Sequence, residues 1–211
     1  MITSYRELDD RQMDVLCELG NIGAGNAATA LSELIDDAVY IGMPRVMALG
    51  YDDVVRMAGN PEEPAVAVMV RFEGDMRGVI LFVVGLEDAK EMAGMLTKGL
   101  PEDEAAEDQD TVSDLKLSAI REIGNIVGSS YLGSTGALTG FKISASAPYV
   151  SVDMIGAVLS ATMSEFSVGS NKILLVEGDF FAKTRRLDSH VILFADIPSL
   201  NRMMAKLGIE G

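Results

Sequence analysis

One eight-residue stretch occurs twice in the sequence, as DVLCELGN at residues 14–21 and as SAIREIGN at residues 118–125. Each copy has an Asp or Ser, a Glu four residues later, an Asn three residues after that, and a Pro 23 residues beyond the Asn. The four positions, which all shift by 104 residues, are Asp14, Glu18, Asn21 and Pro44 in the first copy and Ser118, Glu122, Asn125 and Pro148 in the second. On a helix at about 100° per residue, the first three of them fall within roughly 60° of one another. Each copy therefore predicts a helix with a carboxylate and a carboxamide side by side on one face.

Outward from the first copy, the pattern predicts a helix over residues 7–35 with Asp9 or Asp10 as its N-cap. A strand over residues 38–49 around Pro44 and a short helix over 51–58 are predicted next. Two strands over 65–72 and 78–84, joined by a turn at 73–75, and a helix over 86–96 complete the first half.

The same order restarts after an acidic connector at residues 101–113. The second half predicts a helix over 114–137, a strand around Pro148, a short helix over 154–163, strands over 172–176 and 190–194, and a helix over 197–207. The last strand is offset by 112 residues instead of 104, which predicts an eight-residue insertion around residues 184–189.

Two half repeats, over about 7–100 and 112–208, predict one pseudo-symmetric domain across residues 1–211. Its class is α/β (α+β), with the strands of both halves merging into a shared sheet. Gly20, Gly23 and Gly25 are poor helix formers, so we expect close packing to require them. His190 begins a strand, where we expect a surface or edge residue.

Composition narrows the class of protein. A hydrophobic content of 48% is ample for a packed core, and a formal charge of −15 argues against nucleic-acid binding, which needs clustered Lys and Arg. No apolar run reaches the roughly 18 residues of a membrane span, and the first residues lack the order of a signal peptide. We therefore expect a cytoplasmic protein. One Cys, Cys17, and one His cannot build a Cys/His zinc site, so we expect no metal or cofactor in this chain.

Residues 23–28, GAGNAA, match the loose G-x-G-x-x-A pattern of dinucleotide-binding proteins. That pattern needs a strand directly before it, whereas the preceding residues have helical periodicity. Nucleotide binding is therefore not favoured. An isolated Glu and Asn on a helix face would usually be solvated surface, but the doubled motif argues for a function.

The doubled motif, the ELGNIGAG run at residues 18–25 and the Tyr131-Leu132 segment resemble the CheC family of chemotaxis phosphatases, within the CheC/CheX/FliY superfamily. The resemblance covers nearly the whole chain. It implies a CheC-like fold with two long motif helices packed on a shared sheet. It also implies a cytoplasmic enzyme that removes the phosphoryl group from an aspartate of the response regulator CheY, and a second partner, the receptor deamidase CheD.

The residue types suit this chemistry, because the regulator already supplies Mg²⁺, a Lys and the phospho-Asp, and the phosphatase must mainly place a water. Asn21 and Asn125 would position that water, while Glu18 and Glu122 would pair with the regulator's Lys. The remaining roles implied here are weaker: orientation for Asp14 and Ser118, an auxiliary motif role for Pro44 and Pro148, close approach of the partner at Gly25 and Ser129, and CheD binding for Asp153, at the start of a short exposed helix.

Two function classes stay open at this point. The chain is an enzyme with one or two working sites, or an adaptor that binds CheY or CheD with little turnover. A flagellar motor-switch protein is a less favoured reading, since we expect neither a motor-type domain nor a regulator-binding peptide beside the two halves. Phosphate release from phosphorylated regulator at catalytic ratios would separate the first two.

Overall fold

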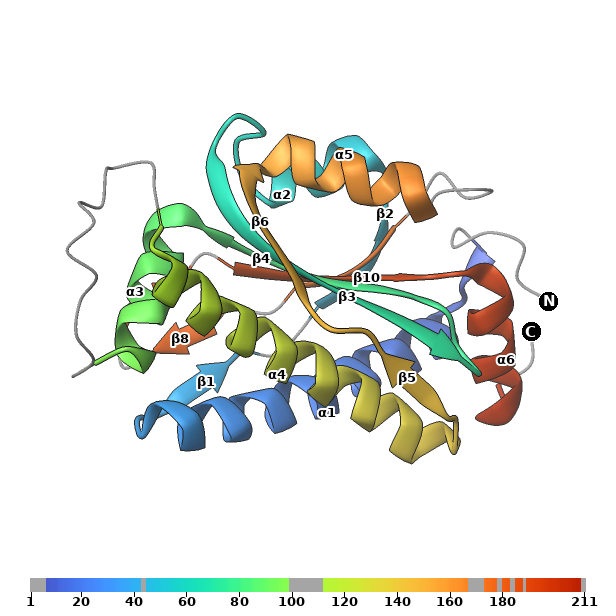
Figure 1. The fold of residues 1–211 in the computed structure, drawn as a ribbon. Coiled ribbons are helices and arrows are strands. Elements are labelled where there is room, and N and C mark those ends of the chain that lie inside the picture. Colours follow the sequence, from blue (N-terminus) through green and yellow to red (C-terminus); the bar gives the residue numbers. More distant parts are fainter. Residues whose placement is uncertain are drawn as a thin grey trace.

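Two 26-residue helices, α1 (Asp10–Ile35) and α4 (Asp114–Thr139), lie side by side and antiparallel over one face of a β-sheet (Figure 1). They belong to a computed structural model that describes residues 7–42, 45–98, 112–166, 173–177, 180–182, 185–187 and 189–209. Two shorter helices, α2 (Tyr51–Met57) and α5 (Ile155–Phe166), cover the other face of the sheet. The helices α3 (Leu86–Leu96) and α6 (Ile197–Lys206) lie at opposite ends of the layer that contains α1 and α4.

Side-chain caps set where α1 and α4 begin. The Asp9 carboxylate accepts a hydrogen bond from the Gln12 backbone N–H at 2.8 Å, and the Gln12 side chain accepts one from the Asp9 N–H at 3.0 Å. Ser113, at the same 104-residue offset from Asp9, accepts from the Lys116 N–H at 3.4 Å. The predicted helices are confirmed, but α1 starts at residue 10 and not at residue 7, because Asp9 is the cap. At its other end α4 runs two residues beyond the prediction, to a left-handed Gly140.

The sheet joins strands from both halves of the chain in the order β2-β7-β10-β4-β3-β5, and β6 also pairs with β3. Its seven strands are β2 (Arg45–Leu49), β3 (Pro64–Gly74), β4 (Gly78–Gly85), β5 (Ile143–Ala145), β6 (Tyr149–Met154), β7 (Ile173–Glu177) and β10 (Ser189–Ala195). A separate three-stranded sheet contains β1 (Val39–Ile41), β8 (Phe180–Ala182) and β9 (Arg185–Leu187).

The two halves exchange strands. β2 of the first half pairs with β7 of the second, and β6 of the second half pairs with β3 of the first. In the middle, β4 and β10 pair along seven residues, from Ser189 with Val84 to Ala195 with Gly78. The order β2-β7-β10-β4-β3-β6 therefore reads the same from either end when the halves are interchanged. The α/β (α+β) class, with two long helices on a shared sheet, is confirmed.

Three strand predictions need correction. The strand expected around Pro148 is two strands, β5 and β6, with the proline between them, which agrees with its lack of a backbone N–H. The strand predicted over residues 38–49 is also two strands, β1 and β2, and Pro44 lies between them, outside the described residues. The predicted insertion around residues 184–189 does not simply lengthen the connection before β10: β9 falls there and forms an additional hairpin with β8, which pairs with β1. Most of the acidic connector, residues 101–111, also lies outside the described residues.

Both faces of the sheet are buried. Alternate residues of β3 show this, because Val66, Val68 and Val70 pack in the core under α1 and α4, while Ala65 and Ala67 pack under α2 and α5. The same burial explains His190, which is 7% exposed where an edge residue was expected: β10 lies between β4 and β7. No helix in the described part of the chain is long and apolar enough to span a membrane.

Close packing accounts for some helix glycines but not for all. A Cβ on Gly124 would lie 2.5 Å from the Val68 side chain, and one on Gly23 would lie 2.8 Å from the Tyr131 ring. Gly25 is different: it is exposed, and a Cβ there would have nothing within 4 Å. The packing explanation is therefore confirmed for Gly23 and wrong for Gly25.

Candidate functional site

The first copy of the motif lies on the solvent side of α1. Asp14 and Glu18 are exposed and Asn21 is half-buried, and the exposed stripe continues to Gly25. The opposite side of the helix holds the residues that pack on the sheet and on α4, among them Leu16 and Leu31. Each turn of α1 thus buries apolar side chains on one side and leaves the motif open on the other.

The second copy repeats this arrangement on α4. Ser118 and Glu122 are exposed, Asn125 is half-buried, and the stripe continues to the exposed Ser129. Ile120, Ile123 and Val127 face the core and are fully buried. Each helix therefore brings its Glu and Asn together one turn apart, as the sequence pattern predicts.

The two motifs form separate sites. Each lies in the N-terminal half of its helix, and α1 and α4 run in opposite directions (Figure 1), so the motifs lie toward opposite ends of the helix pair. Between them the helices are tied by a hydrogen bond from Asn26 Nδ2 to Ser134 Oγ, at 3.0 Å, and by the packing of Tyr131 on Gly23.

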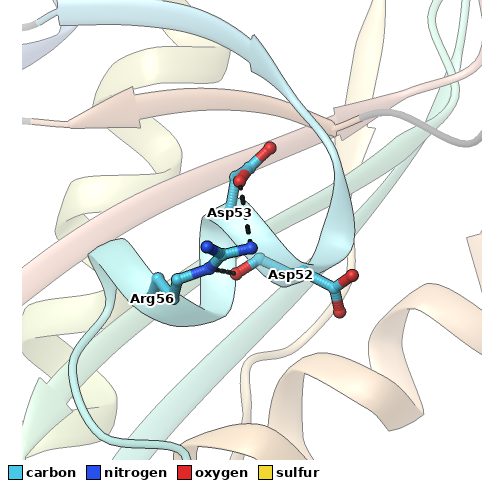
Figure 2. Close-up of polar contacts among 3 residues, drawn as sticks. All are labelled: Asp52, Asp53 and Arg56. Atoms are coloured by element: carbon cyan, nitrogen blue, oxygen red, sulfur yellow. Dashed lines mark hydrogen bonds and ion pairs between the residues drawn. The ribbon is translucent and has the colours of Figure 1, made fainter.

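The polar side chains of both motifs have no partner within the part of the chain that the structure describes. No described residue forms a hydrogen bond or ion pair with the side chains of Asp14, Glu18 and Asn21, or with those of Ser118, Glu122 and Asn125. An exposed acidic side chain on α2 differs. Asp53 pairs with Arg56 at 3.5 Å, and the Arg56 Nε donates to the Asp52 carbonyl at 3.1 Å (Figure 2). The carboxylates and carboxamides of the motifs are therefore available to a partner molecule.

The auxiliary prolines are not on these helices. Pro148 is half-buried in the link between β5 and β6, and Pro44 is among the residues outside the described ranges. In the described part of the chain, no cluster of three or more His, Cys, Asp or Glu side chains could hold a metal ion.

Asp153 lies in a strand, which corrects the expectation that it begins a helix. β6 continues to Met154, because it pairs with β3 from Tyr149 opposite Met69 to Met154 opposite Pro64, and α5 starts only at Ile155. Asp153 is exposed, and its Oδ1 accepts a hydrogen bond from the Met154 N–H at 2.8 Å.

The sequence reading missed the apolar character of this edge strand. Tyr149 is 63% exposed, Val152 40% and Met154 53%. They are among the large hydrophobic side chains that the fold leaves in solvent. Val152 and Met154 share one face of β6, whereas Tyr149 lies on the other face with Asp153, so this edge exposes apolar groups on both faces. The sequence does show these three large apolar residues shortly after a proline. That they lie on an exposed edge strand follows only from the pairing of β6 with β3.

Comparisons with known proteins agree with the motif and the fold. A family model described as the CheC-like family matches residues 12–47. The chain is 30% identical over 209 residues to the CheY-P phosphatase CheC of Bacillus subtilis, with 97% of each protein covered. The crystal structure of Thermotoga maritima FliY matches with a TM-score of 0.72 at 21% identity, covering 96% of this chain and 98% of that one.

A more distant likeness is to a chain in the crystal structure of a CheX–CheY–BeF3–Mg²⁺ complex from Borrelia burgdorferi. Its TM-score is 0.50 at 18% identity, and 82% of this chain and 95% of that chain are covered. At this identity the two structural matches show a shared fold.

Proposed function

The chain belongs to the CheC-like family, and we propose that it is a phosphatase that hydrolyses the aspartyl phosphate of the response regulator CheY. The observation that carries the proposal is the pair of an exposed Glu and a half-buried Asn on the solvent side of each of two helices, with no side-chain partner in the described part of the chain. It agrees with the likeness to the Bacillus subtilis relative, a CheY-P phosphatase, which aligns over 97% of both proteins.

The proposed chemistry needs one well-placed water. The carboxamide oxygen of Asn21 or Asn125 would accept a hydrogen bond from the water and hold its oxygen in line with the phosphorus. As the water oxygen bonds to phosphorus, the bond to the aspartate oxygen breaks, its electron pair stays on the aspartate carboxylate, and a proton of the water passes to the phosphate product or to solvent. The Mg²⁺ expected in the regulator would neutralise charge on the phosphoryl oxygens. The main contribution of this chain would therefore be to orient the attacking water, while the regulator supplies the reacting groups.

Glu18 and Glu122 would dock the regulator. Each is exposed one turn before its Asn, and its carboxylate would pair with the active-site Lys of the regulator. Asp14 and Ser118 continue the same stripe and would assist orientation. Gly25 supports a close approach: it costs helix stability of up to about 1 kcal/mol, yet no neighbour in the fold requires it.

The test is the double variant Asn21→Ala/Asn125→Ala. We expect it to lose nearly all stimulated dephosphorylation while its unfolding free energy changes by less than about 0.5 kcal/mol, because both side chains lie on the solvent side of their helices. Phosphate release from purified phosphorylated CheY, at catalytic ratios, is the measurement. The matched control, Asp52→Ala/Asp53→Ala on α2, should keep full turnover. Turnover that survives in a folded Asn double variant would rule out the mechanism, and wild-type turnover near zero would favour the adaptor alternative.

We propose further that β6 binds the deamidase CheD. The support is the exposed Asp153 carboxylate on an edge strand that also exposes Tyr149, Val152 and Met154. Asp153→Lys should abolish capture of purified CheD and leave phosphate release largely unchanged, because Asp153 is on a different element from both motifs. Glu33→Lys, an equal charge reversal at an exposed site on α1, is the control. CheD capture that is unaffected, or dephosphorylation that falls in parallel, would contradict two separate partner surfaces.

A further inference from the structure

The two motif helices differ at one position beside the site. Cys17 on α1 corresponds to Arg121 on α4 at the 104-residue offset. Cys17 is half-buried and packs against the core, whereas Arg121 is exposed. Each position immediately precedes the motif Glu. The second site therefore has a cation where the first has a neutral thiol turned partly inward.

Arg121 is close to Asn125 on the helix surface. It precedes Asn125 by four residues, which places it about 40° around the helix and roughly 6 Å along its axis. Glu122 lies about 60° to the other side, so Asn125 is between the two charged residues. Because side chains on a helix lean toward its N-terminus, the Asn125 carboxamide lies over the turn that carries Arg121 and Glu122.

The Arg121 guanidinium has no partner within the described part of the fold. No residue there forms an ion pair or side-chain hydrogen bond with it. Its neighbours three and four residues away include no carboxylate, and the adjacent Glu122 does not face it, because consecutive residues point in different directions on a helix. Arg56, by contrast, pairs with Asp53 on its own helix (Figure 2).

A guanidinium in this place suits phosphoryl transfer. Negative charge spreads over the three equatorial oxygens as the bond to the aspartate breaks, and a planar guanidinium can donate two parallel hydrogen bonds to such oxygens. We propose, resting on the function proposed above, that Arg121 is a further catalytic residue of the α4 site. It donates to the phosphoryl oxygens while the water held by Asn125 attacks phosphorus and the electron pair returns to the CheY aspartate. The α4 site then turns over faster than the α1 site.

Single-site backgrounds test this proposal. Asn21→Ala leaves only the α4 site and Asn125→Ala leaves only the α1 site, so phosphate release from phosphorylated CheY should fall further in Asn125→Ala. In the Asn21→Ala background, Arg121→Gln should lower kcat at least about tenfold with little change in KM, because the contact strengthens as charge develops. Arg121→Lys should restore part of kcat, since it keeps the charge but not the planar pair of donors.

The control is Arg11→Gln in the same Asn21→Ala background, which removes an equal exposed charge from α1 and should leave kcat unchanged. The proposal is overturned if Arg121→Gln leaves kcat within about twofold, or if it raises KM alone, which would assign Arg121 to docking. If the Asn21→Ala/Asn125→Ala double variant retains full turnover, the proposed function itself fails. If that double variant is inactive and Arg121→Gln has no effect, only the present inference fails.

Discussion

The helices α1 and α4 are equivalent elements of the two half repeats, and the residues on their buried sides differ in other ways than those on their exposed sides. Both have 26 residues and start at the same 104-residue offset. Their buried sides keep a glycine at the same place, Gly20 and Gly124, but differ seven residues further on, where α1 has Ala27 and α4 has Tyr131, whose ring packs on Gly23. Their exposed sides both keep Glu and Asn at the same places. Packing alone therefore does not explain the shared Glu and Asn, because these side chains lie on the solvent side of each helix.

The exposed sides also differ in charge. The α1 stripe presents Asp14 and Glu18, both acidic, whereas the α4 stripe presents Ser118, Arg121 and Glu122. Two sites with the same Glu–Asn geometry thus offer a partner different electrostatic surroundings. The two helices share the Glu and Asn of the proposed site, whereas the residues around this pair, Asp14 or Ser118 and Cys17 or Arg121, differ.

The largest effect we expect is that of Gly124→Ala. The added Cβ would meet Val68 side-chain atoms at 2.5 Å, so α4 must move away from β3, at a cost of about 2–3 kcal/mol of unfolding free energy. Urea unfolding measures it. Gly25→Ala is the matched control and should stabilise the fold by up to about 1 kcal/mol, since nothing lies within 4 Å of its Cβ. Equal effects of the two changes would refute the contrast drawn between packed and open glycines.

A smaller effect is expected from Tyr131→Phe, at the position where α1 has Ala27. The Tyr131 hydroxyl is buried and has no hydrogen-bond partner among the described residues, so its removal should raise the unfolding free energy by about 1 kcal/mol. The Tyr131 side chain lines a cavity of about 30 Å³, together with Leu16 and Leu132. A loss of stability would mean that the hydroxyl does have a partner, such as a water in that cavity.

The same variant carries a pH signature. Burial raises the pKa of the Tyr131 hydroxyl well above its usual range, so the folded state keeps a proton that the unfolded chain releases near pH 10. The contribution of the protonated Tyr131 hydroxyl to the unfolding free energy is fully present below about pH 10. It is lost as the pH rises beyond that value, because the unfolded chain then releases the proton and the folded chain does not. The unfolding free energy of the wild type should therefore fall more steeply above pH 10 than that of Tyr131→Phe.

The smallest effect should come from exchanging the first motif residue. Asp14→Ser gives α1 the residue that α4 already has, and the exposed carboxylate has no partner in the described part of the fold. We expect less than about a twofold change in affinity for a phospho-analogue-bound CheY, and less still at high salt, because exposed charges are screened. A tenfold loss would show that Asp14 contacts the partner directly.

Local signals in the sequence were sufficient to predict the helices and the central hairpin. Asp9 and Ser113 are strong caps that precede helical periodicity, and the β-branched runs of β3 and β4 flank a tight turn. The exposed Glu and Asn positions followed from the same periodicity. These features depend on neighbours within a few residues.

What the sequence could not show depends on distant pairing. Asp153 is in a strand because β6 joins β3, about eighty residues or more earlier, and His190 is buried because β10 lies between β4 and β7 in a sheet that is covered on both faces. The hairpin of β8 and β9 becomes a second sheet only through β1. Arg121 could have been singled out by aligning the two halves, since charge replaces a thiol there, but its exposure came only with the fold.

The exchange of strands between the halves also has a consequence for how the chain folds. β2 is made early, but its partner β7 follows more than a hundred residues later, with Arg45 opposite Glu177 and Leu49 opposite Ile173. The first half therefore cannot complete its share of the sheet as it leaves the ribosome. Closing so long a loop is entropically costly before its contacts form, so final assembly should be slow and should follow synthesis of the whole chain.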